Sequence, residues 1–421
     1  MSISSIDQAH IWHPLTQHKT SNAPTPIVRA EGAMLYAEDG TAYIDGIASW
    51  YTAMYGHCNP YIIEQVTAQM KTLDQIVFTG FTHAPATTLA QKVLEILPNN
   101  QQKIFFNDNG STAVEAGIKM ALQYHHNKGN TRNTLIAFEN GFHGDTFGAM
   151  SVSGLSVYNG PFEEYFLQVE RIPTPTKENL PHVLQLLETI IAKHPCAGFV
   201  YEPLVQGAAG MQIYDAIGLE AILKVCKEND IITIADEVMT GFGKTGKHFA
   251  SLYLETYPDI ICLSKALTAG LVPMSLTTCT QVVYDAFLDD TVAKGFFHAH
   301  TYSANPIACA AAIAGIDLLI SDDIQLQIQH IHKRHSAFAK AIKTHPKAIN
   351  IRVKGVIFAL ELHTEMERYG NVRNQLFKHF MDHGVCLRPL GNTIYILPPF
   401  VISDAQLDQI YKAIEEALEI F

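Results

Sequence analysis

Two short apolar runs, at residues 231–235 and 260–263, constrain the fold of this chain more than any other feature. Each run is brief, rich in β-branched residues and bounded by polar residues, glycine or proline, which is typical of a buried strand in a parallel sheet. Asp236 and Glu237 follow the first run, and Ser264 and Lys265 follow the second. Because ligands bind at the carboxyl ends of strands in an open α/β sheet, we expect a carboxylate and an amine to face the same crevice.

A lysine and an aspartate in one crevice are the pair that pyridoxal 5'-phosphate chemistry requires from a protein. A partly desolvated lysine loses some of its charge and becomes a nucleophile for carbonyls. A buried aspartate keeps the ring nitrogen of the cofactor protonated, so that the ring accepts electrons. Lys265 and Asp236 are the candidates for these roles. The alternative interpretation is that Asp236 caps a strand and Lys265 is solvated, because short motifs often match by chance.

Between these runs, residues 241–246 match the pattern G-x-G-x-x-G. That pattern indicates a nucleotide site when it directly follows a strand and opens a helix. Here residues 236–240 intervene, and residues 247–251 are a weak helix start. Val238 also occupies the place of the first glycine of a P-loop. We therefore interpret the segment as a flexible glycine-rich loop beside the site, and a non-catalytic nucleotide-binding module remains the distant alternative.

The bulk properties bound the class of protein. A chain of 421 residues suggests two or three domains, and 48% hydrophobic with 17% charged residues is a globular composition. A net charge of −12 argues against a general binder of nucleic acid or of membrane surfaces, and no apolar run is long enough to span a membrane. Seven dispersed cysteines without a C-x-x-C pair, and an N-terminus without a signal pattern, predict reduced thiols in a cytoplasmic protein.

Strand and helix patterns alternate from about residue 103 to residue 265, which predicts a wound, mostly parallel sheet. Residues 33–47 predict a β-hairpin around an Asp-Gly turn, after an irregular arm at residues 1–30 that contains one short helix. From about residue 350, strands at 350–362 and 385–397 with helices between and after them predict a smaller α+β lobe. We expect residues 1–55 to belong to the small domain with residues 321–421, and residues 56–320 to form the large domain.

Two loops after predicted strands carry candidate cofactor contacts. Gly110 and Ser111 open a helix after the strand at 103–106, and a helix N-terminus with free N–H groups binds phosphate readily. Ordinary helix capping is the alternative there. Phe142, in a Gly-Phe-His-Gly loop, can place its ring on a planar ligand.

Several polar and aromatic residues are candidates for substrate contacts. Trp50 and Tyr51 form either a wall for an apolar ligand or part of the core. Arg388, near Tyr395 in the small lobe, suits a substrate carboxylate, although a solvated arginine is the common alternative. His298 and His300 are expected on one face of a strand, as hydrogen-bonded residues and not as metal ligands.

The order of these signals resembles the class III aminotransferases, which are pyridoxal phosphate enzymes of fold type I. The resemblance covers nearly the whole chain and rests on Trp12-His13-Pro14, residues 45–50, 109–115 and 143–151, Asp236-Glu237-Val238, residues 240–243, Ser264-Lys265, Asn305-Pro306, Arg388-Pro389 and Pro398-Pro399. Within that family the same motifs resemble the branch that aminates 8-amino-7-oxononanoate in biotin synthesis, where S-adenosylmethionine is the usual amino donor.

The resemblance implies an α/β fold with a mostly parallel central sheet in the large domain and a smaller α+β domain. It also implies roles for the cofactor contacts. Lys265 would bind pyridoxal 5'-phosphate and move the proton, and Asp236 would pair with the ring nitrogen. The remaining contacts are Gly110 and Ser111 on the phosphate, Val238 and Phe142 on the two ring faces, and His300 and Thr301 on the cofactor of the other subunit of a homodimer.

The substrates implied are a small-molecule amino donor and a keto acceptor. Trp50 and Tyr51 would wall their channel, and Arg388 would bind a carboxylate with Tyr395 nearby. The chain departs from the usual family pattern at four places on this side: Leu15 and Phe142 replace tyrosines, Lys244 replaces an arginine, and Ala299-His300 replaces Gly-Pro. These departures leave the donor open between S-adenosylmethionine and lysine, and another class III aminotransferase, acting on ω-amino acids or ornithine, is the alternative.

Overall fold

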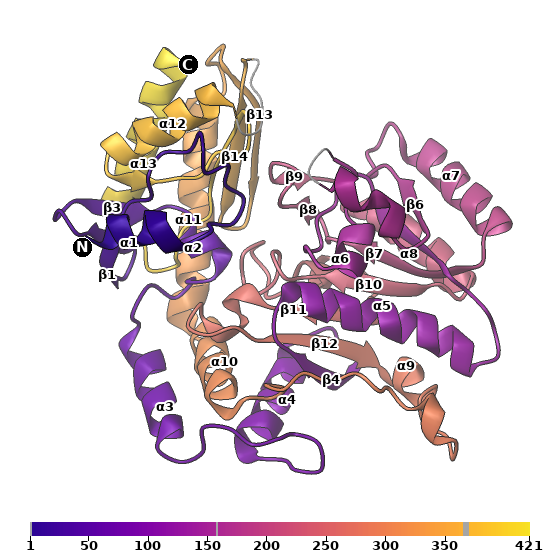
Figure 1. Cartoon of the computed structure of the whole chain (residues 1–421). Helices are drawn as coiled ribbons and strands as arrows, with labels where there is room; N and C mark the ends of the chain where they lie inside the picture. Colours follow the sequence, from indigo (N-terminus) through magenta and orange to yellow (C-terminus); the bar gives the residue numbers. More distant parts are fainter. Residues whose placement is uncertain (1, 157–158, 365–369) are drawn as a thin grey trace.

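The computed structural model describes residues 2–156, 159–364 and 370–421, and it forms a large lobe and a small lobe (Figure 1). The large lobe is built on a seven-stranded sheet in the order β4-β12-β11-β10-β7-β5-β6. Its strands are β4 (Gln101–Asn107), β5 (Thr134–Phe138), β6 (Val169–Ile172), β7 (Cys196–Tyr201), β10 (Ile232–Asp236), β11 (Ile260–Leu263) and β12 (Ser275–Thr280). Only β12 of this sheet is antiparallel to its neighbours. This topology confirms the predicted mostly parallel sheet.

Helices cover both faces of this sheet, as a buried parallel sheet requires. Those of the large lobe are α3 (Pro60–Met70), α4 (Ala84–Ile96), α5 (Gly110–Asn127), α6 (Phe147–Ser151), α7 (Leu180–Lys193), α8 (Ala216–Glu228), α9 (Gln281–Asp285) and α10 (Pro306–Leu319). α5 approaches the sheet closely, because a Cβ atom on Gly117 would lie 3.2 Å from Ile234 Cγ2. Asn109 caps the first turn of α5 in a capping box with Thr112. These contacts fix the N-terminus of α5 beside the ends of β10 and β11.

The small lobe combines both ends of the chain. An antiparallel sheet in the order β13-β14-β16 packs with the C-terminal helices, and a second sheet in the order β1-β2-β3-β15 joins the N-terminal hairpin to it. The elements are α1 (Ile3–His10), β1 (Ile27–Glu31), β2 (Met34–Ala37), β3 (Ala42–Asp45), α2 (Ala48–Tyr51), α11 (Asp322–Ala341), β13 (Ala348–Lys354), β14 (Ile357–Leu362), α12 (Asn371–Asp382), β15 (Val385–Cys386), β16 (Thr393–Ile396) and α13 (Asp404–Ile420). In Figure 1 the indigo N-terminal segment accordingly lies beside the yellow helices.

Three local expectations differ from the structure. The arm at residues 1–30 contains the expected short helix, α1, but it ends in the strand β1, which was not expected. The two apolar stretches of the small lobe are each divided: Gly355, with φ +58°, separates β13 from β14, and residues 387–392 separate β15 from β16. β15 is not part of the three-stranded sheet. It pairs in parallel with β3, which places Val385 opposite Ile44.

None of the helices in the described part of the chain has the length and apolar character needed to cross a bilayer.

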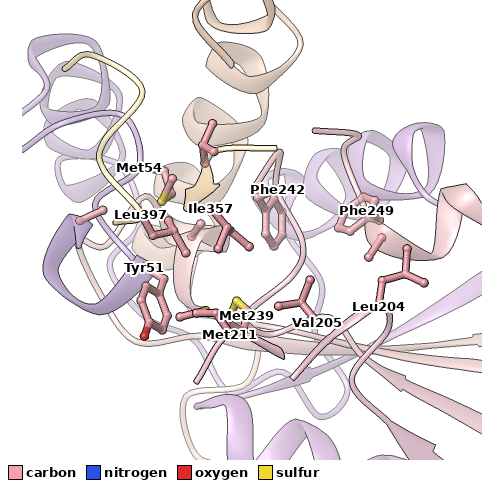
Figure 2. Close-up of a cluster of buried hydrophobic side chains, with 14 of the residues drawn as sticks. Tyr51, Met54, Leu204, Val205, Met211, Met239, Phe242, Phe249, Ile357 and Leu397 are labelled. Carbon is pink, nitrogen blue, oxygen red and sulfur yellow. The ribbon is translucent and has the colours of Figure 1, made fainter. Parts of the chain in front are cut away.

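Residues 241–245 of the glycine-rich segment are buried, which corrects the prediction of a flexible loop. A Cβ atom on Gly355 would lie 2.3 Å from Gly246 N, so the segment meets the small lobe backbone to backbone. The Val356 N–H donates to the Lys244 carbonyl oxygen at 3.0 Å. In Figure 2, Phe242 lies in a buried cluster that includes Tyr51 and Met54 from the N-terminal segment and Ile357 and Leu397 from the small lobe. The glycines therefore serve close packing between the lobes.

Candidate active site

A cavity of about 2580 Å³ lies at the carboxyl ends of the parallel strands and is also lined by residues of the N-terminal arm and of the small lobe. It brings together ten of the predicted site residues: Leu15, Trp50, Tyr51, Gly110, Ser111, Phe142, Asp236, Val238, Lys265 and Arg388. The lining also includes Glu202 and His143. Residues from both lobes therefore face one common space.

Asp236 ends β10 and is 4% exposed. Its Oδ1 accepts a hydrogen bond from the Val238 N–H at 3.0 Å, and its Oδ2 lies 2.8 Å from His143 Nδ1. A carboxylate only accepts hydrogen bonds, so Nδ1 of His143 is the donor. His143 Nε2 is buried without a hydrogen-bond partner in the part of the chain that the structure describes. The carboxylate is thus held from two sides.

Lys265 follows β11, the parallel neighbour of β10, and is half-buried. Its backbone has φ +51°, a left-handed conformation that is unusual for a residue with a side chain. Burial lowers the pKa of its amine, and the nearby Asp236 and Glu202 oppose that shift. Nζ lies 5.1 Å from the centre of the Tyr51 ring. The arrangement favours an amine that can lose its proton and act as a nucleophile.

Glu202, at the end of β7, is a buried carboxyl that holds two loops of the cavity. Its Oε1 accepts from the Phe142 N–H at 3.0 Å, and its Oε2 accepts from the Gly207 N–H at 2.9 Å. Burial raises its pKa to about 7; His143 opposes this shift, and Asp236 adds to it. Glu202 therefore titrates near neutral pH and fixes the backbone that carries Phe142.

We expect the free energy of unfolding of the cofactor-free protein to fall as pH rises from 4.5 to about 7, through Glu202. The folded-state pKa is raised, so the folded protein holds this proton more tightly than the unfolded chain, and ionisation of Glu202 opposes folding. The loss is about 3 kcal/mol at most. Urea denaturation of the native protein and of Glu202→Gln across this range measures it, because the other groups cancel in the difference. A difference that rises with pH would contradict the assignment.

The N-terminus of α5 forms a narrow cradle whose donor groups would suit a phosphate. A Cβ atom on Gly110 would lie 2.9 Å from Val238 Cγ1, so only glycine fits there without a shift. Across the loop, Gly144 has φ +133°, and a Cβ atom on it would lie 2.1 Å from Ser111 Oγ. Free N–H groups of the first helical turn and the Ser111 hydroxyl are phosphate donors. With an aspartate for the ring nitrogen and an amine for the aldehyde, these residues fit pyridoxal 5'-phosphate.

The opposite wall is aromatic and cationic. The guanidinium carbon of Arg388 lies 4.7 Å from the centre of the Trp50 ring, a cation–π contact that leaves the N–H groups at the guanidinium edge available to a carboxylate. Tyr51 and Tyr395 meet edge to face with ring centres 5.9 Å apart, and burial raises the pKa of Tyr395 to about 12. Tyr395 thus packs behind the wall and does not itself line the cavity.

Trp50 and Tyr51 belong to a left-handed helical turn, α2. The φ angles are +46° at Ala48, +45° at Ser49, +66° at Trp50 and +72° at Tyr51. Left-handed helical backbone costs roughly 1–2 kcal/mol for each residue with a Cβ atom. Because Trp50 remains 40% exposed while Tyr51 is buried, the structure gives Trp50 the wall position and Tyr51 both wall and core contacts.

Besides Tyr395, four predicted residues lie away from the cavity lining. Lys244 is fully buried, and its Nζ donates to the Gly241 carbonyl oxygen at 2.7 Å. Ala299, His300 and Thr301 lie in a loop before α10, which also corrects the expectation of a strand at residues 298–300. As expected, the two histidines of this loop are hydrogen-bonded, with 3.0 Å between His298 Nε2 and His300 Nε2. No group suited to a metal occurs among the residues that the structure covers.

His143 is the main functional residue that sequence reasoning missed. The Gly-Phe-His-Gly pattern directs attention to the Phe142 ring, while the contact of His143 spans 93 residues. The Glu-Pro sequence at 202–203 identifies a carboxylate at a strand end, but it does not reveal that Glu202 holds the Phe142 loop. The only local signal for the role of His143 was a histidine followed by a glycine after a strand.

Comparisons with known proteins agree with this geometry. The family model described as aminotransferase class-III matches residues 15–418. The adenosylmethionine-8-amino-7-oxononanoate aminotransferase of Synechococcus elongatus is 39% identical over 419 residues, which cover 97% of this chain and 98% of that protein. The protein of the same name from Geobacter sulfurreducens is 38% identical, over 98% of this chain and 96% of its own length.

Solved structures show the same relationship. The adenosylmethionine-8-amino-7-oxononanoate aminotransferase of Methanocaldococcus jannaschii superimposes with a TM-score of 0.91 at 32% identity, covering 98% of both chains. An ω-transaminase from Pseudomonas jessenii, in complex with PMP, has a TM-score of 0.91 at 26% identity and covers 100% of this chain and 98% of its own. Backbone similarity alone therefore does not separate the two kinds of enzyme, whereas sequence identity favours the first.

Proposed function

Since this chain belongs to the class III aminotransferase family, whose enzymes use pyridoxal 5'-phosphate, we propose that it transfers an amino group to 8-amino-7-oxononanoate, with S-adenosylmethionine as the donor. The product would be 7,8-diaminononanoate, in biotin synthesis. The observation that carries the proposal is the juxtaposition in one cavity of Lys265 and Asp236 with the Arg388–Trp50 wall. The names of the full-length relatives support the choice of acceptor.

Each residue of the cavity has a role in this proposal that its contacts support. When bound, the cofactor supplies an electron sink for the electron pair left when a proton leaves the donor carbon. Lys265 Nζ would hold the cofactor and then, after the donor amine has displaced it, hold and move that proton as general base and acid. Asp236, held by His143, would keep a positive charge at the ring nitrogen. Gly110 and Ser111 would bind the phosphate.

The substrate side divides into a cation and aromatic walls. Arg388 would bind the carboxylate of the acceptor, because a planar fork of N–H donors matches a carboxylate in two hydrogen bonds. Trp50 and Tyr51 would cover its apolar chain and exclude water from the reacting atoms. Leu15 lines the arm side of the cavity without a polar group, so recognition there would be apolar.

We further propose that two copies of the chain complete the site. His300 and Thr301 lie outside the cavity of their own chain, which fits a role toward the cofactor of the partner subunit. Large apolar side chains are exposed nearby and on the arm: Trp12, Phe81, Phe297 and Tyr302. Exposed apolar side chains mark an interaction site where they gather into one patch, and a dimer contact would cover them. The seven free cysteines support a reducing compartment, and we propose the cytoplasm.

The proposed reaction predicts that purified enzyme with added pyridoxal 5'-phosphate forms diaminononanoate from 8-amino-7-oxononanoate and S-adenosylmethionine. A site that binds the polar groups of its true substrate rejects analogues lacking them by about 10⁴-fold, so we expect ornithine to give only background product. Mass spectrometry of the product, with S-adenosylmethionine, lysine and ornithine compared as donors, measures it. Product with lysine alone would reassign the donor. Turnover of ω-amino acids without any amination of the oxononanoate would overturn the proposal in favour of an ω-transaminase, which the structural neighbours make the second candidate.

A further inference from the structure

The left-handed turn α2 is held by a buried carboxylate that none of the proposed catalytic steps uses. Asp45 is 1% exposed, at the end of β3. Its Oδ2 accepts hydrogen bonds from the Ser49 N–H at 2.7 Å and the Ser49 hydroxyl at 3.1 Å. Its Oδ1 accepts from the Ile47 N–H at 3.2 Å. The carboxylate thus ties down the entry of the turn and its second residue.

His57 closes this arrangement from the other end of the segment. Its Nε2 lies 2.8 Å from Asp45 Oδ2, and the His57 backbone N–H and carbonyl pair with Gly32 at 2.7 and 3.0 Å. Because Oδ2 only accepts, Nε2 carries the proton and the imidazole is oriented by the bond. The Asp45 carboxylate therefore binds Ile47 and Ser49 at the start of the turn and His57 after it.

The exit of the turn is fixed against the segment that follows Lys265. A Cβ atom on Gly270, which has φ +80°, would lie 2.9 Å from Ala53 N and 2.9 Å from Thr52 C, so backbone packs directly on backbone. The Tyr51 ring reaches back to Lys265 Nζ at 5.1 Å, and Trp50 stacks with Arg388. A shift of the turn would therefore move the aromatic wall relative to both the amine and the carboxylate-binding cation.

We propose that Asp45, together with His57, is a positioning residue for substrate recognition: it holds residues 48–51 in a left-handed conformation that places Trp50 against Arg388 and Tyr51 against Lys265. The substrate in this inference is the one named in the proposed function, whereas the geometry does not depend on that function. Four consecutive residues other than glycine with positive φ persist only when their surroundings determine them, and such strain concentrates at functional sites. Asp45 supplies the side-chain hydrogen bonds to the Ile47 and Ser49 N–H groups, and the Thr52 hydroxyl adds one to the Ser49 carbonyl oxygen at 2.9 Å.

The chain offers a direct probe, because Trp12 and Trp50 are its only tryptophans and Trp12 does not line the cavity. In a Trp12→Phe background, we expect Asp45→Asn to increase quenching of Trp50 fluorescence by acrylamide in the holoenzyme. An asparagine has one acceptor oxygen in place of two, so it leaves N–H groups of the turn unpaired. We expect KM for the oxononanoate to rise about 10- to 100-fold, as loss of hydrogen bonds to a charged group implies, with a smaller change in kcat.

Three further variants keep the proposal falsifiable. Asp45→Asn/Ala48→Gly should recover part of both effects, because glycine adopts positive φ without strain. His57→Gln, a milder change, should show the same pattern at smaller size if Asp45→Asn fails to fold. Asp259→Asn is the matched control: Asp259 accepts hydrogen bonds from the Thr233 N–H at 2.9 Å and the Thr233 hydroxyl at 2.7 Å and lies outside the cavity, so Trp50 quenching and KM should stay at native values.

Native quenching and native KM in Asp45→Asn would overturn the proposal, and so would equal changes in Asp259→Asn. If Asp45→Asn/Ala48→Gly recovered neither the quenching nor KM, the proposal would also be overturned, because the effect of Asp45 would then not depend on the conformation of the turn. The fluorescence measurement needs no substrate. If the enzyme fails to aminate the oxononanoate, the quenching result still tests the positioning role of Asp45. Failure of the proposed function is therefore distinguishable from failure of this inference.

Discussion

Replacing Lys265 by alanine is expected to lower the rate of transamination by about 10⁴-fold or more, because general acid–base catalysis alone contributes up to that factor and the covalent link adds to it. The side chain is half-buried between Asp236 and the Tyr51 ring, and burial lowers the pKa of its amine. No other amine among the cavity-lining residues replaces it: Lys244 is buried behind the cavity, where it donates to Gly241. Steady-state assays of the holoenzyme measure the loss.

Two companion variants separate chemistry from folding. Lys265→Arg keeps a positive charge, but a guanidinium does not give up its proton near neutral pH, so it should be as inactive as alanine. Lys224→Ala removes an exposed lysine of α8 and should leave turnover unchanged. Reduction with borohydride followed by peptide mapping should place the cofactor on the peptide containing Lys265 in the native enzyme alone. A Lys265→Ala enzyme that retains more than about one part in 10² of native turnover would contradict the assignment.

The positions of Asp236 and Lys265 were predictable because they follow from a rule of the fold. Once two apolar runs are read as neighbouring parallel strands, both carboxyl ends must lie at one edge of the sheet, and the structure places Asp236 opposite Cys262 there. The N-terminus of α5 was predictable for a similar reason, since a strand, a glycine and a capped helix follow one another in the sequence. In both cases a local sequence pattern identifies the elements, and the topology of a parallel sheet then gives their positions.

The contacts that support the site were not predictable, because they join residues far apart in the sequence. His143 meets Asp236 across 93 residues, and β3 pairs with β15 although the two strands come from opposite ends of the chain. The left-handed turn at 48–51 contains no glycine that would indicate positive φ angles from the sequence, and its conformation depends on Asp45. The glycine-rich segment at 241–246 was predicted to be a flexible loop, yet most of it is buried where it packs against Gly355.

Replacing Asp236 by asparagine is expected to reduce kcat by about 10²- to 10³-fold. An opposite charge beside an ionisable group shifts its pKa by about 1–3 units, and each unit is worth about 1.4 kcal/mol, so the neutral amide forfeits up to about 4 kcal/mol of stabilisation of a protonated ring nitrogen. Asp236 is 4% exposed, which limits screening of that charge by water. The pH dependence of the visible absorption of the holoenzyme, measured beside kcat, tests whether the ring nitrogen has lost its proton.

His143→Gln distinguishes the charge of Asp236 from its orientation. The carboxylate remains in this variant and keeps the hydrogen bond from the Val238 N–H, but the 2.8 Å contact with the imidazole is lost. We therefore expect a smaller fall in kcat than in Asp236→Asn, of about tenfold, with most of the ring-nitrogen signature retained. If Asp236→Asn kept the native spectrum across pH and lost activity no further than His143→Gln, the carboxylate would not be the partner of the ring nitrogen. The pairing of β10 with β11 would then position Lys265 alone, and the electron sink would need another source of positive charge in this cavity.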